Sequence, residues 1–566
     1  MAHSPKAVIM GIDGATWRLV APWIEQGELP NLGRLKSQGA SGNLLSTIPP
    51  VTAPAWSSMI TGRNPGQHGL FDFAGHRSDE YGVEYLVGAQ RRCPTIWKIL
   101  SDRGYRVGVI NVPMTYPPEE LSGYMISGMD TPDESSPFIA PESLRQEIQD
   151  ELGGLHLDIH HLGYMTSDSK RLAVIDELLS IEEERVRLIA HLAEKHPCDA
   201  VMFVINAVDQ IQHHFWHYMD PEHPRFDAQG KKQFGDAILK VYRRIDALLG
   251  EVMEIFGTEP LYMVVSDHGF QPSSDLFLCL NKALAQGGFL TFKESFSPAA
   301  YALGKVSDTL RQTLSPKAKQ KISSLLPWAR AKVEASGVAS HIDWEKTRAY
   351  AFEAAVTSPN VWINLKGKRP NGTVSAAEYL PLIEEIRDYL LSLTVPGSDT
   401  PLIPRIWHKE EIYSGAALDE APDLVLDWWQ GKGFTPRPSV VNGRLAEYPV
   451  VERVNTPLEG GKEWGGTHSE NGVVILSGPR VTAGQKLEGA KITDIAPTLF
   501  AALGEPPLTE FDGNALIDGA PQTNGKSVVE GTIPPQPESS AENEVAISEE
   551  DREKIRQRLK MLGYLD

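Results

Sequence analysis

The sequence predicts an α/β fold built on a largely parallel β-sheet that helices cover on both faces. Five short apolar runs have the length and composition of buried strands, at residues 7–13, 105–113, 199–209, 261–269 and 471–479. Segments with helical spacing of apolar residues lie between them, as at 175–195 and 234–256. This alternation of strands and helices is typical of a parallel sheet, in which a functional site forms at the carboxyl ends of the strands.

The rest of the chain predicts insertions and a tail around this core. One stretch is basic and helix-like, another mixes strand candidates with many Pro and Gly, and a third has the composition of a linker before a capped helix that starts at Ser548. We therefore divide the chain into a core at 1–284 and 461–518, a helical cap inserted at 285–345, an inserted α/β subdomain at 346–460, a linker at 519–547 and a C-terminal helix at 548–566 that docks on the core.

Composition narrows the class of protein and its partners. The 566 residues are 41% hydrophobic and 23% charged, as in an ordinary globular protein, and the formal net charge of −20 argues against a nucleic-acid polymer as partner. No apolar stretch reaches the length of about 18 residues that a membrane span needs, and no signal peptide is expected. Three scattered cysteines, Cys93, Cys198 and Cys279, form no disulfide framework. We expect a soluble cytoplasmic protein, and the sequence does not indicate its oligomeric state.

Metal-binding residue types recur where the predicted strands end. The positions are Asp13, Asp209, His213, Asp267, His268 and His468. An Asp at a strand end is more often a cap, a lone loop His is usually surface, and the neighbouring His214 and His217 are expected to be ordinary helix residues. Six such residues at ends that a sheet brings together nevertheless indicate a metal site. A mixture of Asp and His suits Zn²⁺, with Mn²⁺ as the alternative.

The stretch "IPPVTAPAWSSMITGRNPGQHG" places Thr52 at the start of a run with helical character. Thr52 is either a helix cap or a nucleophile. A threonine hydroxyl needs an activating partner to attack at neutral pH, and coordinated dications would supply one.

An ordered set of motifs resembles the alkaline phosphatase superfamily, in particular its type I phosphodiesterase/nucleotide pyrophosphatase-like branch. The motifs are "GIDG" at 11–14, "TAPAW…TGRNPGQHG" at 52–69, "D…H" at 209 and 213, "SDHG" at 266–269 and "GGTH" at 465–468. The resemblance implies a three-layer sandwich around a mostly parallel sheet. It further implies that Asp13, Asp267 and His268 hold one metal, that Asp209, His213 and His468 hold a second, and that Thr52 is the nucleophile of a phosphate-ester hydrolase.

Departures from the family pattern leave the substrate open. Phe73 stands where nucleotide pyrophosphatases carry an Asn that contacts the substrate phosphate, and Arg91 and Arg92 are candidates for a replacement cation or for a surface pair. Trp56 stands where a sulfatase would need Arg, which disfavours sulfatase activity. A small-molecule phosphodiester or phosphomonoester is the expected substrate. A phosphomutase and a catalytically silent metal-binding or interaction protein are the alternatives.

Overall fold

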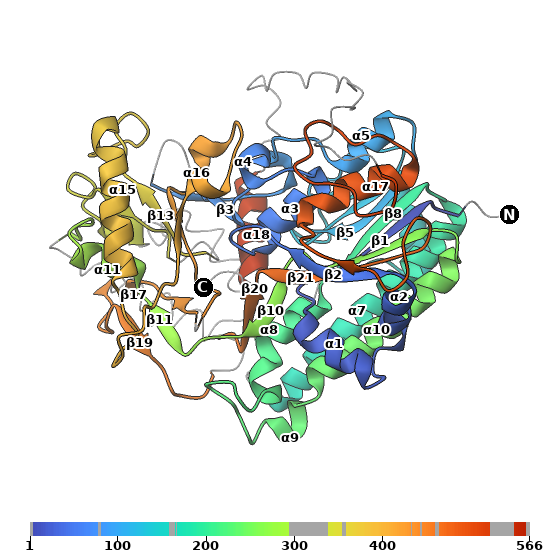
Figure 1. The fold of residues 1–566 in the computed structure, drawn as a ribbon, viewed down its shortest axis with the longest axis horizontal. Helices are drawn as coiled ribbons and strands as arrows, with labels where there is room; N and C mark the ends of the chain where they lie inside the picture. Colours follow the sequence, from blue (N-terminus) through green and yellow to red (C-terminus); the bar gives the residue numbers. More distant parts are fainter. Residues whose placement is uncertain are drawn as a thin grey trace.

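The computed structural model describes residues 4–76, 81–157, 165, 167–293, 338–353, 358–431, 433–441, 444–458, 463–520 and 548–561. Its largest element is a nine-stranded sheet of order β22-β2-β21-β9-β1-β8-β5-β6-β7 (Figure 1). The strands are β1 (Ala7–Ile12), β2 (Ala40–Leu45), β5 (Val107–Val112), β6 (Gly123–Ser127), β7 (Ile139–Ala140), β8 (Ala200–Ile205), β9 (Leu261–Val265), β21 (Asn471–Ser477) and β22 (Lys486–Leu487).

All five predicted strands belong to this sheet. The central strands β9, β1, β8, β5 and β6 run parallel, and β22 runs parallel to β2. The run at 471–479 forms β21, which is antiparallel to both of its neighbours, β2 and β9, and β7 is antiparallel to β6. The prediction of a mostly parallel sheet is thus confirmed, with antiparallel pairs on either side of the central strands.

Helices cover both faces of the sheet because its strands are apolar on both sides. Val8, Met10 and Ile12 of β1 belong to one hydrophobic cluster, and Ala7 and Ile9 to another, as the two-residue period of a strand requires. The first cluster includes residues of α1 (Trp17–Glu25), α2 (Pro30–Gln38), α7 (Asp168–Lys195), α8 (Ala207–Met219) and α10 (Ala237–Phe256). The second includes residues of α3 (Thr52–Thr61), α5 (Ile96–Asp102) and α17 (Ile495–Leu503), which lie on the opposite face of the sheet in Figure 1.

A second, antiparallel sheet lies beside the large one, on the left in Figure 1. It has the order β12-β13-β15-β14, with β12 (Ala349–Tyr350), β13 (Asn360–Ile363), β14 (Ile406–His408) and β15 (Leu424–Leu426). The helix α15 (Ala376–Leu391) accompanies it, and a capping box of Ser375 and Glu378 begins that helix. These elements fall within the inserted segment that the sequence predicts at 346–460.

Short elements complete the described chain. The small sheets are β3 (Ala74–His76) with β4 (Val83–Tyr85), β10 (Gly269–Pro272) with β20 (Gly466–Ser469), β11 (Leu276–Leu278) with β16 (Thr435–Pro436) and β19 (Val451–Arg453), and β17 (Val440–Val441) with β18 (Arg444–Leu445). The remaining α-helices are α4 (Pro65–His68), α6 (Glu142–Leu152), α9 (Lys231–Phe234), α11 (Leu280–Gln286), α16 (Lys409–Ile412) and α18 (Glu549–Met561). Single 3₁₀ turns are η1 (Gly88–Gln90), η3 (Val338–His341), η4 (Leu418–Glu420) and η5 (Ile492–Asp494).

The C-terminal helix α18 packs against β4. Ile555 and Leu559 are each 1% exposed, and Arg552 forms an ion pair with Glu84 at 2.8 Å. Residues 521–547 of the expected linker and 294–337 of the expected cap lie outside the described residues. Among the residues that are described, no helix is long and apolar enough to cross a membrane.

Candidate active site

The carboxyl ends of three neighbouring strands bring together residues that lie far apart in the sequence. Asp13 follows β1 directly, and Asp267 follows β9 after one residue. Asp209 lies in the first turn of α8, which begins just after β8. Because β8 and β9 both pair with β1, the three carboxylates meet at one edge of the sheet. Gly14 has a φ of 68°, and a Cβ there would lie 3.1 Å from Asp209 Oδ1, so the chain turns here at a position that favours glycine.

The first group of candidate ligands consists of Asp13, Asp267 and His268. Nε2 of His268 lies 3.4 Å from Asp13 Oδ1 and 3.3 Å from Asp267 Oδ2. The Trp56 indole donates to Asp13 Oδ2 at 3.0 Å, and the Gly14 amide donates to Asp267 Oδ1 at 3.4 Å. Each carboxylate therefore keeps one oxygen turned toward His268. Within the described chain, neither of those two oxygens accepts a hydrogen bond.

The second group consists of Asp209, His213 and His468. Oδ1 of Asp209 lies 3.4 Å from Nε2 of each histidine, and the two Nε2 atoms are 3.0 Å apart. His213 is four residues after Asp209 on α8, the spacing that places two side chains on one helix face. His468 comes from β20, where it pairs with Phe270 of β10. The two groups adjoin, since the rings of His268 and His468 stack with centroids 3.7 Å apart.

The other ring nitrogen of each histidine faces a backbone carbonyl. Nδ1 of His213, His268 and His468 lies 3.0, 3.1 and 2.9 Å from the carbonyl oxygens of Gly466, Gly269 and Pro50, respectively. A carbonyl oxygen only accepts, so each Nδ1 carries a proton and donates it, and each Nε2 is turned toward the cluster. This arrangement of a backbone carbonyl behind each imidazole is the one that orients metal-ligating histidines.

Burial and mutual repulsion perturb the pKa values of the cluster. Burial, followed by the charge of Asp267, raises the pKa of Asp13 well above its ordinary value, and burial with the charge of Asp209 does the same to Asp267. Burial also lowers the pKa of His268 and His468. For Asp209, burial opposes ionisation, but the facing His213 and His468 outweigh it and hold the pKa well below the usual range.

Thr52 lies beside the first group. It is the first residue of α3, fully buried, and its Oγ1 is 3.2 Å from Nε2 of His268. The N-cap of α3 is Val51, whose side chain makes no capping bond, so the interpretation of Thr52 as a helix cap is wrong. The hydroxyl is thus placed at a helix N-terminus and within contact of a candidate ligand.

The residues present fit divalent metal ions. Two carboxylate oxygens lack hydrogen-bond donors among the described residues, and the Nε2 atoms of three histidines face the same cluster. The raised pKa values of Asp13 and Asp267 indicate a cluster short of positive charge. Ligand atoms of Asp13, Asp267 and His268 lie within 4.8 Å of one another, as do those of Asp209, His268 and His468. Nitrogen together with oxygen donors suits Zn²⁺ or Mn²⁺.

A family comparison agrees with this geometry. A sequence profile described as "Type I phosphodiesterase / nucleotide pyrophosphatase" matches residues 7–435. The chain belongs to the type I phosphodiesterase/nucleotide pyrophosphatase family. It is therefore a phosphoric ester hydrolase of the metal-dependent alkaline phosphatase superfamily, as the sequence motifs imply.

Solved structures of similar fold include phosphonoacetate hydrolase from Sinorhizobium meliloti 1021 in complex with phosphonoacetate. It is 14% identical, with a TM-score of 0.51 over 89% of this chain and 96% of that chain. Murine ectonucleotide pyrophosphatase/phosphodiesterase 5 is 12% identical, with a TM-score of 0.48 over 89% and 96% of the respective chains. A search of curated proteins found no match. The first of these structures supports the predicted alkaline-phosphatase-like fold.

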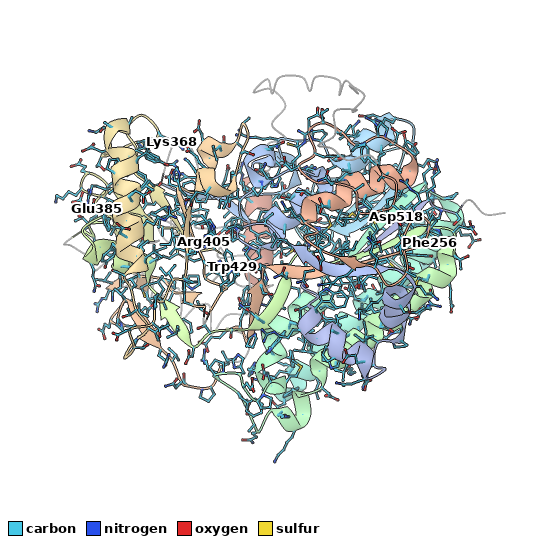
Figure 2. All side chains as sticks on the ribbon, in the orientation of Figure 1. Phe256, Lys368, Glu385, Arg405, Trp429 and Asp518 are labelled. Carbon is cyan, nitrogen blue, oxygen red and sulfur yellow. The ribbon has the colours of Figure 1, made fainter. Side chains whose placement is uncertain are left out.

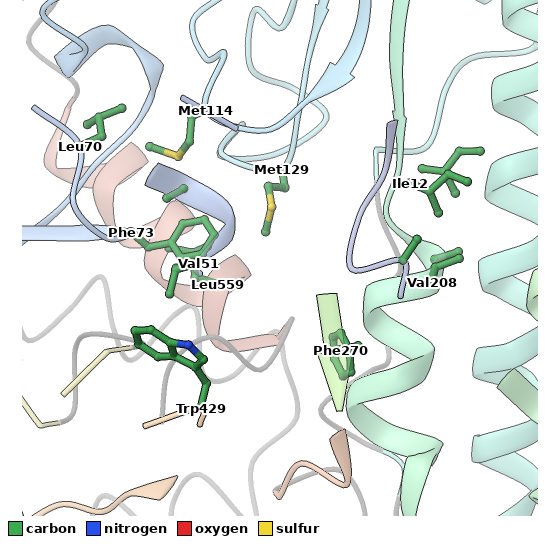
Figure 3. Packing of buried hydrophobic residues seen from close by; sticks show 14 of the residues in the cluster. Ile12, Val51, Leu70, Phe73, Met114, Met129, Val208, Phe270, Trp429 and Leu559 are labelled. Atoms are coloured by element: carbon green, nitrogen blue, oxygen red, sulfur yellow. The ribbon is translucent and has the colours of Figure 1, made fainter. Parts of the chain in front are cut away.

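The three residues predicted to bind substrate contact other parts of the protein instead. Phe73 is fully buried, in the same hydrophobic cluster as Val51 and Leu559 (Figure 3). Arg91 donates to the carbonyls of Cys93 and Met114 at 3.2 and 2.9 Å and forms a 2.6 Å ion pair with Glu119. Arg92 is half-exposed and pairs with Glu420. No hydrogen bond or ion pair found among the described residues joins either arginine to the cluster around Thr52.

Several residues that support the cluster carry no sequence signal of their own. Trp56 orients Asp13 through its indole N–H. Trp464 lies over His213 with ring centroids 3.7 Å apart, and Phe270 meets that ring edge-on at 4.7 Å. These contacts join helices, strands and loops from distant parts of the chain, which explains why no local pattern indicates them.

Proposed function

We propose that this phosphodiesterase-family protein hydrolyses small-molecule phosphate esters through a phospho-threonine intermediate on Thr52, beside two divalent metal ions. The observation that carries the proposal is the position of Thr52 Oγ1, 3.2 Å from His268 Nε2 at the junction of two buried groups of ligand atoms. Thr52 is not at the N-cap position of α3, which Val51 occupies, so helix capping does not account for a threonine there.

The two groups would hold one metal each, with Zn²⁺ favoured and Mn²⁺ the alternative. Asp13, Asp267 and His268 would bind the first ion, and Asp209, His213 and His468 the second. Bound dications would lower the pKa of the Thr52 hydroxyl and offset the negative charge of the phosphoryl group.

The reaction would proceed in two successive displacements at phosphorus. Thr52 Oγ1 attacks phosphorus, the bond between phosphorus and the ester oxygen breaks, and the hydroxyl proton ends on the released alcohol. Water then attacks the same phosphorus from the opposite side, the bond to Thr52 Oγ1 breaks, and Oγ1 regains a proton. The backbone N–H groups in the first turn of α3 face the phosphoryl group, since the start of a helix favours anions.

The direct test uses purified protein loaded with Zn²⁺ or Mn²⁺ and the substrates p-nitrophenyl phosphate and bis-p-nitrophenyl phosphate. We expect turnover that EDTA abolishes and a phosphate group on Thr52 in acid-quenched samples, detected by mass spectrometry. Fewer than about one metal ion per chain together with no turnover of either ester would contradict the proposal.

The relative rates on the two esters decide the type of ester. Family membership favours the diester, and a clear preference for p-nitrophenyl phosphate would exclude that choice. Phe73 in place of the amide of nucleotide pyrophosphatases argues against a nucleotide diester. Transfer of the phosphoryl group to a second hydroxyl of the substrate, rather than to water, would identify the phosphomutase alternative.

We further propose that residues 1–284 and 461–518 form the catalytic core and that the segments at 285–345 and 346–460 shape the substrate pocket. A reducing compartment such as the cytoplasm suits the three cysteines, which are buried and free of disulfides.

A further inference from the structure

The turn that follows β15 contains three consecutive buried residues, each with one side-chain polar atom that has no hydrogen-bond partner among the described residues. Asp427, Trp428 and Trp429 are 0%, 6% and 2% exposed, respectively. Across the described residues, Asp427 Oδ2 and the indole Nε1 atoms of Trp428 and Trp429 have no hydrogen-bond partner. Buried polar groups are nearly always satisfied, so three such atoms in consecutive residues make this turn a candidate contact for a bound molecule.

This turn is fixed next to the metal-ligand groups. The ring of Trp428 lies 6.4 Å from that of His468, and the side chain of Gln271, on the strand paired with β20, donates to the Trp429 carbonyl. Gln430 donates to Glu470 at 2.7 Å, two residues beyond His468. Figure 2 shows Trp429 between the second sheet and the large sheet. A group esterified to a phosphate at the cluster would therefore reach this turn.

Positions in and just before β13 add two further polar groups. Asn360 pairs with Val425 of β15, and its Oδ1 is buried without a partner among the described residues. Ser358 Oγ is buried in the same way, while its backbone amide donates to Asp72 at 3.2 Å. The region thus offers donors from the indoles, acceptors from the carboxylate and amide, and a hydroxyl that serves as either.

The mixture of donors and acceptors indicates the class of ligand. Burial raises the pKa of Asp427 to about 6, so the carboxylate is mostly ionised at neutral pH and disfavours a second phosphate. Trp429 stacks on Trp407 with centroids 5.5 Å apart and planes at 8°, so one face of its ring is already covered and its N–H edge is the polar part that remains. A hydroxyl both donates and accepts, and a ring or chain of hydroxyls satisfies both kinds of group at once.

We propose that Asp427, Trp428 and Trp429 form a subsite for a polyhydroxylated, sugar-like group esterified to the phosphate. This proposal rests on the proposed function and names its substrate class. Trp428 and Trp429 are specificity-determining residues here: the indole N–H groups donate to ligand hydroxyls, and Asp427 Oδ2 accepts from one.

The test measures binding to the zinc-loaded Thr52→Ala protein by calorimetry. The probes are glucose 1-phosphate, glycerol 1-phosphate, inorganic phosphate and cyclohexyl phosphate, which has a ring of the same size without hydroxyls. We expect glucose 1-phosphate to bind about tenfold or more tightly than cyclohexyl phosphate, the effect of one or two added hydrogen bonds. Equal or weaker binding of both hydroxylated probes would overturn the subsite.

Variants separate ligand binding from packing. In the same background, Trp428→Phe and Asp427→Asn should each remove most of the preference for the hydroxylated probe. Trp97→Phe is the matched control, because Trp97 Nε1 is also buried without a partner among the described residues but lies with α5, in the hydrophobic cluster on the α3 face of the sheet. An unchanged preference in Trp428→Phe, with a melting temperature equal to or above that of the parent, would mean that water alone fills the site.

Failure of the proposed function gives a different pattern. If the wild-type protein turns over no aryl phosphate ester and the zinc-loaded Thr52→Ala protein binds no inorganic phosphate, the phosphate site itself is refuted. If phosphate binds and esters turn over, but the hydroxylated probes have no advantage, only the sugar-like subsite is refuted.

Discussion

Replacement of Asp267 by Asn should stabilise the metal-free protein. Asp13 and Asp267 are buried, and their ligand oxygens lie within 4.8 Å of one another. At that distance and an effective dielectric constant of about 20, two full charges repel by about 3.5 kcal/mol. In the wild-type protein the Gly14 amide donates to Asp267 Oδ1 at 3.4 Å. Asparagine removes the charge repulsion but keeps an oxygen that can accept this hydrogen bond.

The sign of the pH dependence follows from the raised pKa values of both carboxyls. The folded metal-free chain holds a proton that the unfolded chain releases, so its stability falls as pH rises above the ordinary Asp pKa of about 3.9 and through the raised values. We expect the advantage of Asp267→Asn to be full near pH 8 and absent near pH 4. For a cooperative unit of about 350 residues, 3.5 kcal/mol corresponds to a rise in melting temperature of about 4–5 °C.

Thermal unfolding in EDTA at pH 8 measures the effect, and excess Zn²⁺ should reverse the order because only the wild type keeps the full ligand set. Asp246→Asn is the matched control. Asp246 is equally buried, but it accepts from the amides of Leu32 and Asn31 at 2.8 and 3.0 Å, so its replacement should lower the melting temperature with and without metal. A wild-type protein as stable as Asp267→Asn in EDTA at pH 8 would refute the charge-repulsion argument.

Three further outcomes test separate parts of the site. Thr52→Ala should lower turnover by about a thousandfold or more with unchanged metal content. Thr52→Ser should retain a phosphoenzyme that acid quenching traps. Substantial turnover by Thr52→Ala would favour direct attack by water. His468→Ala should lower metal content, measured by elemental analysis, from two ions per chain toward one and reduce activity with it; full occupancy would remove His468 from the ligand set. Leu559→Ala should weaken the docking of α18 by about 2–5 kcal/mol, because Leu559 is 1% exposed, and this should appear as faster tryptic cleavage near the C-terminus at an unchanged global melting temperature.

The candidate ligands could be predicted from sequence because each is tied to the end of an element. Asp13 and Asp267 follow apolar strands, and the spacing of Asp209 and His213 on a helix fixes their shared face. A parallel sheet then brings these ends together without further information. His468 depends instead on β20, which pairs with β10 from a distant part of the chain, although its place just before the last strand already made it a candidate.

Other features depend on contacts that no local pattern records. The direction of β21 is antiparallel because residues 466–469 return along β10 before the strand begins, while an apolar run looks the same in either direction. The proton on each histidine Nδ1 is set by carbonyls from three different segments. Arg91 forms an ion pair with Glu119 and donates to two backbone carbonyls. The sequence alone could not distinguish this paired arginine from a surface cation.

The position of the proposed subsite implies a division of labour between core and insertion. The core supplies the candidate metal ligands and Thr52, whereas Asp427, Trp428 and Trp429 come from the segment at 346–460. Hydrogen bonds from Gln271 to the Trp429 carbonyl and from Gln430 to Glu470 join that segment to the β10–β20 strand pair and the residues just after it. A substitution in the insertion can therefore shift the esterified group relative to the phosphate without a change in any ligand. Under the proposed subsite, the ligand motifs predict the reaction, whereas the inserted turn determines which ester is accepted.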